Sequence, residues 1–165
     1  MKSKVNRNFK IIPLVFNILI PVLGGFLVSY INRNAISIYS NTVKKPFFTP
    51  PNMVFVIVWS ILYVLMGFSS YRIYIKNKEN NNDNGAYFFY LVQLLLNFMW
   101  SFIFFTFRLY GISFIWIIIL FIFVVITFVK FIRIDKTAGF LLIPYMLWLV
   151  FAGIINYFVW VFNEM

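Results

Sequence analysis

The 165-residue chain contains no cysteine and no histidine. The missing thiols exclude disulfides and thiolate chemistry. The missing imidazoles exclude histidine acid–base catalysis, and with the thiols they take away the commonest haem and zinc ligands. The function therefore has to be built without the side chains on which most metal and nucleophilic sites depend.

Acidic residues are also scarce, and they stand outside the long apolar segments. The four are Glu79, Asp83, Asp135 and Glu164. Ion-coupled transporters and proton pumps place ionisable groups at membrane depth, so these classes lose most of their support. Paired-carboxylate and metal-assisted hydrolysis lack the residues that they need. A catalytic site would have to use Ser, Tyr, Lys and Trp alone.

Apolar residues dominate what is present: 63% of the chain is hydrophobic, 23% is aromatic and only 11% is charged, against about 25% charged in a soluble domain. Five apolar segments reach the roughly 20 residues that cross a bilayer. They predict an all-α membrane protein, a bundle of five transmembrane helices in a single domain over residues 1–165. The predicted spans are 11–31, 51–75, 86–107, 112–129 and 138–162, with a long loop at 32–50 and a polar turn at 76–85.

The first span is too long for a signal-peptide core and has no cleavage site after it, so we expect it to be retained. The net charge of +10 comes from basic residues dispersed around the spans, which indicates lipid headgroups as partners and not nucleic acid. One side carries Lys2, Lys4, Arg7, Lys10, Arg72, Lys76, Lys78, Lys130, Arg133 and Lys136, and the other Arg33, Lys44, Lys45 and Arg108. This bias predicts a multi-pass protein of the cell membrane with a cytoplasmic N-terminus.

The loop at 32–50 ends in the basic and aromatic stretch KKPFFTPP at 44–51. A residue before proline is pushed away from the helical region, so Thr49 and Pro50 should both be extended. Pro51 can then serve as the first helical residue of the second span, because its missing N–H has no helical partner there. So stiff a connection predicts a lid over a site between the helices.

Polar and aromatic side chains recur at helical spacing inside three spans. The sets are Trp59, Tyr63 and Met66; Gln93, Asn97 and Ser101, with Trp100 beside them; and Trp148, Ala152 and Asn156. Such amides often only join helix to helix, a contribution of around 1 kcal/mol. Small residues beside large aromatic ones make either tight helix packing or a slot for a flat ligand. The spacing leaves both interpretations open.

Several motifs resemble one known family when they are taken together and in order. They are LIPVLG at 19–24, KP-x-x-x-PP at 45–51 with Trp59 eight residues later, LLNFMWS at 95–101, LIPYMLW at 142–148 and NYFVW at 156–160. This set resembles the TspO/MBR family, which includes translocator proteins and tryptophan-rich sensory proteins. The chain departs from the family pattern at Tyr39, Ser40 and Phe48, and it lacks the basic residue that completes a sterol-contact pattern after the fifth span.

The resemblance implies a five-helix bundle, often dimeric, whose first loop covers a pocket for porphyrins and synthetic benzodiazepine-type ligands. It places Trp59, Asn97, Trp100, Trp148 and Ala152 in that pocket, with Pro50 and Pro51 under the lid, and we add Tyr63 and Ser101 from the spacing. Some members of the family are reported to degrade protoporphyrin in light, a reaction that would involve Trp59 and Trp148.

The resulting hypothesis is a membrane receptor or sensor that binds a tetrapyrrole and needs no cofactor of its own. Arg33, Lys44 and Lys45 stand on the lid side, where they could contact the propionates of a porphyrin. Metal-free porphyrin fits better than haem, since the usual axial ligands are missing. Two rival hypotheses are a light-dependent porphyrin-degrading enzyme and a non-catalytic membrane regulator whose pocket is vestigial.

Overall fold

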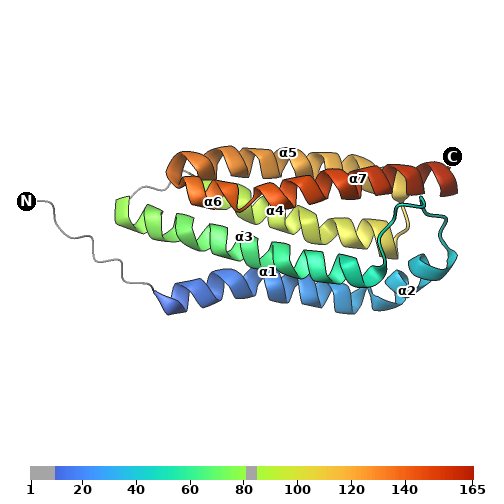
Figure 1. The fold of residues 1–165 in the computed structure, drawn as a ribbon, viewed down its shortest axis with the longest axis horizontal. Helices are drawn as coiled ribbons and strands as arrows, with labels where there is room; N and C mark the ends of the chain where they lie inside the picture. Colours follow the sequence, from blue (N-terminus) through green and yellow to red (C-terminus); the bar gives the residue numbers. More distant parts are fainter. Residues whose placement is uncertain (1–9, 81–84) are drawn as a thin grey trace, which may run out of the picture.

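The computed structural model describes residues 10–80 and 85–165, and these residues form a bundle of long helices (Figure 1). Five helical segments are long and apolar enough to cross a membrane, which confirms the predicted fold class. The helices are α1 (Ile11–Ile31), α2 (Arg33–Thr42), α3 (Asn52–Asn80), α4 (Ala86–Ser101), the π-helical η1 (Phe102–Thr106), α5 (Tyr110–Ile134), α6 (Lys136–Phe140) and α7 (Ile143–Asn163). Lys2, Lys4 and Arg7, and residues 81–84 of the predicted turn, lie outside the described residues.

A close crossing joins α1 to α3. A Cβ atom placed on Gly67 would lie 2.6 Å from the Cα of Ile18 and 2.8 Å from the carbonyl oxygen of Asn17. Glycine therefore lets the two backbones meet, as small residues commonly do between membrane helices. Pro21 has no N–H to give to the Asn17 carbonyl one turn earlier, so that carbonyl is free to face α3.

The prediction of a long loop at 32–50 is wrong over its first half, because residues Arg33–Thr42 form α2. The sequence carries a helical signal there: Ile36, Tyr39 and Val43 follow one face, Tyr39 is buried, and Val43 packs against the core. Only residues 43–51 remain without helix, and Pro51 directly precedes α3 instead of opening it. In Figure 1, α2 lies at one end of the bundle beside the C-terminus.

The spans also differ from their predicted bounds where polar residues continue a helix beyond the apolar stretch. Helix α3 runs to Asn80 instead of ending at residue 75, and α5 covers Tyr110–Ile134 instead of 112–129. The predicted turn at 76–85 is thus helical through Asn80. An ion pair at 3.4 Å between Lys76 and Glu79 supports this exposed last turn. Counting apolar residues alone could not find these ends.

The last span is two helices and not one. Pro144 cannot donate to the carbonyl of Phe140 and its ring clashes with that carbonyl, so α6 ends there and α7 starts at Ile143. Asp135 accepts the Ala138 N–H at 2.8 Å and caps the start of α6. The short helix therefore has a defined beginning and end.

The end of the bundle that contains α6 is closed by contacts between α3 and the α5–α6 connection. The Arg72 guanidinium donates two hydrogen bonds to the Asp135 carboxylate, at 2.7 and 3.0 Å. Burial raises the pKa of Asp135, but these bonds, the Ala138 N–H and the nearby charge of Arg72 lower it more, so it lies below its ordinary value. The Ser69 hydroxyl donates to the Ala138 carbonyl at 2.7 Å. These hydrogen bonds join α3 directly to α6 and to the residue that precedes it.

Candidate functional site

A cavity of about 330 Å³ lies at the opposite end of the bundle, next to α2. This is near the lower end of the volumes typical of small-molecule sites. Five helical segments and η1 contribute to its wall. The lining residues are Val22, Gly25, Phe26, Val28, Ser29, Asn32, Ile36, Tyr39, Asn52, Phe55, Val56, Trp59, Ser60, Tyr63, Trp100, Ser101, Phe104, Phe105, Ala152, Ile155 and Asn156.

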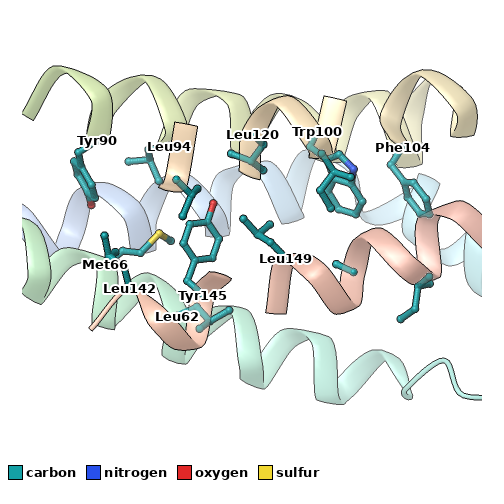
Figure 2. Packing of buried hydrophobic residues seen from close by; sticks show 14 of the residues in the cluster. Leu62, Met66, Tyr90, Leu94, Trp100, Phe104, Leu120, Leu142, Tyr145 and Leu149 are labelled. Carbon is teal, nitrogen blue, oxygen red and sulfur yellow. The ribbon is translucent and has the colours of Figure 1, made fainter. Parts of the chain in front are cut away.

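Two stacked aromatic pairs form parts of that wall. On α3, Trp59 and Tyr63 stack with their ring centroids 5.5 Å apart. Trp100 and Phe104, from α4 and η1, stack at 4.9 Å, and Figure 2 shows these two rings side by side. The small side chain of Ala152 on α7 leaves room beside them. The result is an aromatic chamber in which the small residue Ala152 lies beside the rings.

A chain of buried hydrogen bonds holds the α3 pair in place. The Tyr63 hydroxyl donates to Asn97 Oδ1 at 2.9 Å, and Asn97 Nδ2 donates to the Tyr145 hydroxyl at 3.0 Å. The Tyr145 hydroxyl in turn donates to Gln93 Oε1 at 3.1 Å. Figure 2 shows Tyr145 between the helices with its hydroxyl turned toward α4. Asn97 therefore positions Tyr63 and does not itself line the cavity.

A second set of bonds fixes Trp100. Its Nε1 donates to Asn156 Oδ1 at 3.1 Å, and the Ser113 hydroxyl donates to the same oxygen at 3.0 Å. The Asn156 amide nitrogen donates to the Tyr110 carbonyl at 2.9 Å. All four residues in this set are buried. The Trp100 indole therefore cannot turn without breaking its hydrogen bond to Asn156, and no water replaces that bond.

The π-helical segment η1 contributes Phe104 of the second stacked pair and one further ring, Phe105, to the wall. The Phe107 N–H bonds the Phe102 carbonyl five residues earlier, at 2.9 Å, which is the π-helical pattern. Tyr39 of α2 meets Phe104 and Phe105 edge-on, with centroids 5.2 and 5.3 Å away. Burial, and after it the proximity of Tyr110, raises the pKa of Tyr39, so its phenol stays neutral.

Helix α2 contributes Ile36 and Tyr39 to the cavity wall, whereas the following segment 43–51, the lid, contributes no lining residue. The Lys45 ammonium donates to the Ser40 carbonyl at 2.6 Å and lies 5.1 Å from the centre of the Tyr39 ring, so it caps α2. Lys44 and Asn163 exchange two hydrogen bonds, at 3.1 and 2.9 Å, which tie the lid to the end of α7. Asn52 donates to the Ser40 hydroxyl at 2.6 Å.

The structure brings five of the predicted site residues to the cavity wall: Trp59, Tyr63, Trp100, Ser101 and Ala152. The other seven are not among the lining residues: Pro50, Pro51, Asn97, Trp148, Arg33, Lys44 and Lys45. Arg33 is exposed next to the lining residue Asn32 and stacks on the Tyr30 ring at 4.4 Å. Of the three predicted propionate contacts, Lys45 is thus already engaged by α2.

Trp148 stands behind the wall. Its ring meets Phe55 at 5.4 Å and Phe151 at 5.5 Å, and Phe55 is the residue that faces the cavity. Its buried Nε1 has no hydrogen-bond partner among the described residues. Trp148 is therefore not among the residues that line the chamber, whereas the indoles of Trp59 and Trp100 are.

The predictions missed several lining residues, notably Asn32, Tyr39, Phe55, Phe104 and Phe105. The amphipathic spacing of α2 could have found Tyr39. Nothing in the local sequence signals the π-helix that turns Phe104 and Phe105 inward. Asn32 accepts a hydrogen bond from the Thr106 hydroxyl across the bundle, a contact that only the fold reveals.

The lining residues that the structure describes carry no formal charge. Among residues 10–80 and 85–165 there is also no cluster of acidic side chains that could hold a metal ion. The wall offers ring faces, hydroxyls and amides. Such a chamber is suited to bind a flat, largely apolar molecule by stacking and by area burial.

The fold and the chamber together define a class: a multi-pass membrane protein with five spans and an aromatic cavity near one end of the helix bundle. The family model described as TspO/MBR family matches residues 17–161, and the chain belongs to that family. It is 36% identical over 153 residues to the tryptophan-rich protein TspO of Archaeoglobus fulgidus, covering 93% of this chain and 98% of that protein.

Two further relatives cover most of both chains. The tryptophan-rich protein TspO of Chlorobaculum tepidum is 33% identical over 150 residues, which is 91% of this chain and 95% of that protein. The translocator protein of Bos taurus is 32% identical over 157 residues, 93% of this chain and 91% of that protein. Bacterial, archaeal and mammalian members are thus similar to this chain over almost its whole length.

Proposed function

We propose that this membrane protein binds a metal-free porphyrin, or a similar flat tetrapyrrole, in the aromatic chamber and acts as a receptor or sensor for it. The observation that carries the proposal is the chamber itself, in which two indoles and a stacked tyrosine surround an uncharged space beside Ala152. A macrocycle stacked there gains roughly 0.5–1.5 kcal/mol per aromatic pair beyond its area burial.

The charged edge of a porphyrin would have to lie outside the uncharged chamber. Arg33 supports this arrangement, because it is exposed and comes directly after the lining residue Asn32 in the sequence. Lys44 is exposed on the lid beside Asn163. Both residues belong to the side with fewer basic residues, so the proposal places α2 and the lid outside the cytoplasm and the N-terminus inside.

The test is a titration of the detergent-purified protein with protoporphyrin IX, followed by tryptophan emission. Because Trp59 and Trp100 line the chamber, bound porphyrin should quench emission saturably, with one site per chain. A linear quenching curve without saturation would refute the proposal and favour the regulator with a vestigial pocket.

Illumination of the complex distinguishes porphyrin binding from porphyrin degradation. Under the proposal, the absorbance of the bound porphyrin is the same after illumination as after an equal time in the dark. Loss of porphyrin in light, abolished by Trp59→Phe, would instead support the enzyme hypothesis, since Trp59 is the implicated tryptophan that lines the chamber.

A further inference from the structure

A ligand could reach the cavity from two sides, and the two sides differ in how they are covered. The side toward the membrane surface is covered by α2, whose Tyr39 is only 8% exposed and sits edge-on against two phenylalanine rings. The lid behind it is held by the paired hydrogen bonds of Lys44 with Asn163 and by the Lys45 cap on α2. Entry from the water would have to break these contacts.

The side toward the lipid is framed by residues that line the cavity and are also exposed on the outside of the bundle. Phe26 is 66% exposed and Val56 is 62% exposed, and Ser29 and Ser60 are exposed as well. Two of these residues belong to α1 and two to α3. A side chain that both lines a cavity and faces outward stands at its opening, so the cavity communicates with the outside between these two helices.

The packing of α1 against α3 explains why the opening is there. The helices touch backbone to backbone at Gly67. At Gly25 the Tyr63 ring covers the glycine so closely that a Cβ atom would overlap it. Beyond this ring, toward the end of α1 and the start of α3, the cavity occupies the space between them. The tight crossing below acts as the lower edge of the opening.

We propose that the cavity is filled sideways from the bilayer, through this opening between α1 and α3, and that its ligand is an amphiphile dissolved in the acyl layer. Ser29 and Ser60 lie roughly 3 and 12 Å along their helices from the ends of α1 and α3 nearest α2, at 1.5 Å per residue. The opening thus spans the depth just below the headgroups. A ligand with a flat apolar body and one polar edge at headgroup level matches that depth.

This inference rests on the proposed porphyrin site, and loading kinetics test it. The protein is reconstituted in phosphatidylcholine vesicles, protoporphyrin IX is added, and quenching of tryptophan emission is followed in time. The double variant Ser29→Phe with Ser60→Phe narrows the opening and should slow loading roughly tenfold or more, within the range that conformational obstacles impose on association. Val56→Ala, a milder change that widens the same opening, should speed loading.

Two controls separate the routes. Leu27→Phe with Ile57→Phe enlarges exposed residues on the same helices that do not line the cavity, and loading should match the parent. Asn163→Ala releases the lid from α7, and loading should again be unchanged. Faster loading in Asn163→Ala, together with parental rates in the narrowed and widened variants, would overturn lateral entry.

An equilibrium titration in detergent distinguishes the two ways of failing. If the parent binds saturably while the narrowed variant loads at the parental rate, lateral entry is wrong and the porphyrin site stands. If the parent shows no saturable binding, the proposed function fails and the entry route falls with it. A narrowed variant that loads slowly but reaches parental occupancy supports the proposal.

Discussion

The two ends of the bundle use similar polar side chains to opposite effect. At the α6 end, Ser69, Arg72 and Asp135 bond directly to partners on other helices and close the space between them. At the α2 end, Asn97 and Asn156 bond to Tyr63 and Trp100, and those rings stand around a cavity. At one end the polar side chains thus bond to each other or to backbone, and at the other they hold aromatic rings that line a cavity.

This comparison gives each end its own expected response to mutation. Changes at the α6 end should alter the stability of the fold and leave ligand binding in the folded fraction as it was. Changes at the α2 end should alter binding and leave the stability nearly constant. Five experiments test that division, and the expected size of the effect decreases from one to the next.

Asp135→Ala should lower the free energy of unfolding by about 3 kcal/mol, because it leaves the Arg72 guanidinium and the start of α6 without their acceptor. Thermal unfolding in detergent measures the change, and porphyrin affinity below the transition should be parental. Lys136→Ala, at the exposed neighbouring position, is the control and should unfold like the parent. Equal stability of the two variants would show that the ion pair does not close this end.

Ala152→Leu should remove porphyrin binding, by at least a hundredfold or about 2.8 kcal/mol, because the larger side chain fills the space beside the rings. Titration by tryptophan quenching measures it. The matched control is Gly153→Ala, whose new Cβ would meet its nearest neighbour at an unstrained 3.7 Å from Ile117 and which does not line the cavity. Parental affinity in Ala152→Leu would place the ligand elsewhere.

Acid should weaken the α6 end in the same way as Asp135→Ala, but less. The fold holds the pKa of Asp135 below its ordinary value, so the carboxylate stabilises the fold above about pH 4, and this contribution fades as the pH falls toward the lowered pKa. Unfolding temperatures measured between neutral and acidic pH should drop in the parent and stay flatter in Asp135→Ala. If the unfolding temperatures of the parent and of Asp135→Ala fall in parallel as the pH is lowered, Asp135 is not the group that weakens this end in acid.

Trp59→Phe should weaken porphyrin binding by roughly 1 kcal/mol, since it shortens a ring that lines the chamber and stacks on Tyr63. Trp148→Phe should cost less, because that ring lies behind Phe55 and its Nε1 has no partner among the described residues to lose. Isothermal titration of both variants ranks them. A larger loss for Trp148 would mean that the ligand reaches past Phe55.

The smallest effect is expected for the lid cations. Lys44→Ala with Lys45→Ala should reduce affinity by about 0.2–1 kcal/mol at low salt, and the loss should fade as salt is added. Much of the change would come through the lid, since Lys45 caps α2. Binding of the parent is compared at two ionic strengths, and identical affinities would argue against a propionate contact.

The spans could be predicted from the sequence because each depends on one property, an apolar stretch of sufficient length. Trp59, Trp100 and Ala152 could be found because their motifs resemble those of the family, and Tyr63 and Ser101 because helical spacing puts them on the same faces. The ends of α3 and α5 could not be predicted from apolar length, since polar residues such as Lys76 extend a helix once the apolar part has formed.

Two other predicted site residues are not among those that line the cavity, and the reason in each case is tertiary. Trp148 has the spacing of a pocket residue, yet Phe55 of another helix stands in front of it. Lys45 has the charge of an anion contact, yet its ammonium is used by the carbonyl of Ser40. In both cases the fold brings a neighbouring residue against the side chain. The spacing of residues within one segment cannot predict that contact.

The π-helix η1 has a consequence for how related proteins diverge. A π-helical turn holds one residue more than an α-helical turn would, so deleting a single residue within Phe102–Thr106 would restore α-helix there and change which of its side chains face the cavity. Phe104 and Phe105 would then leave the wall while α4 kept its packing. Ligand preference in such proteins can therefore change through one insertion or deletion, with every surrounding residue the same.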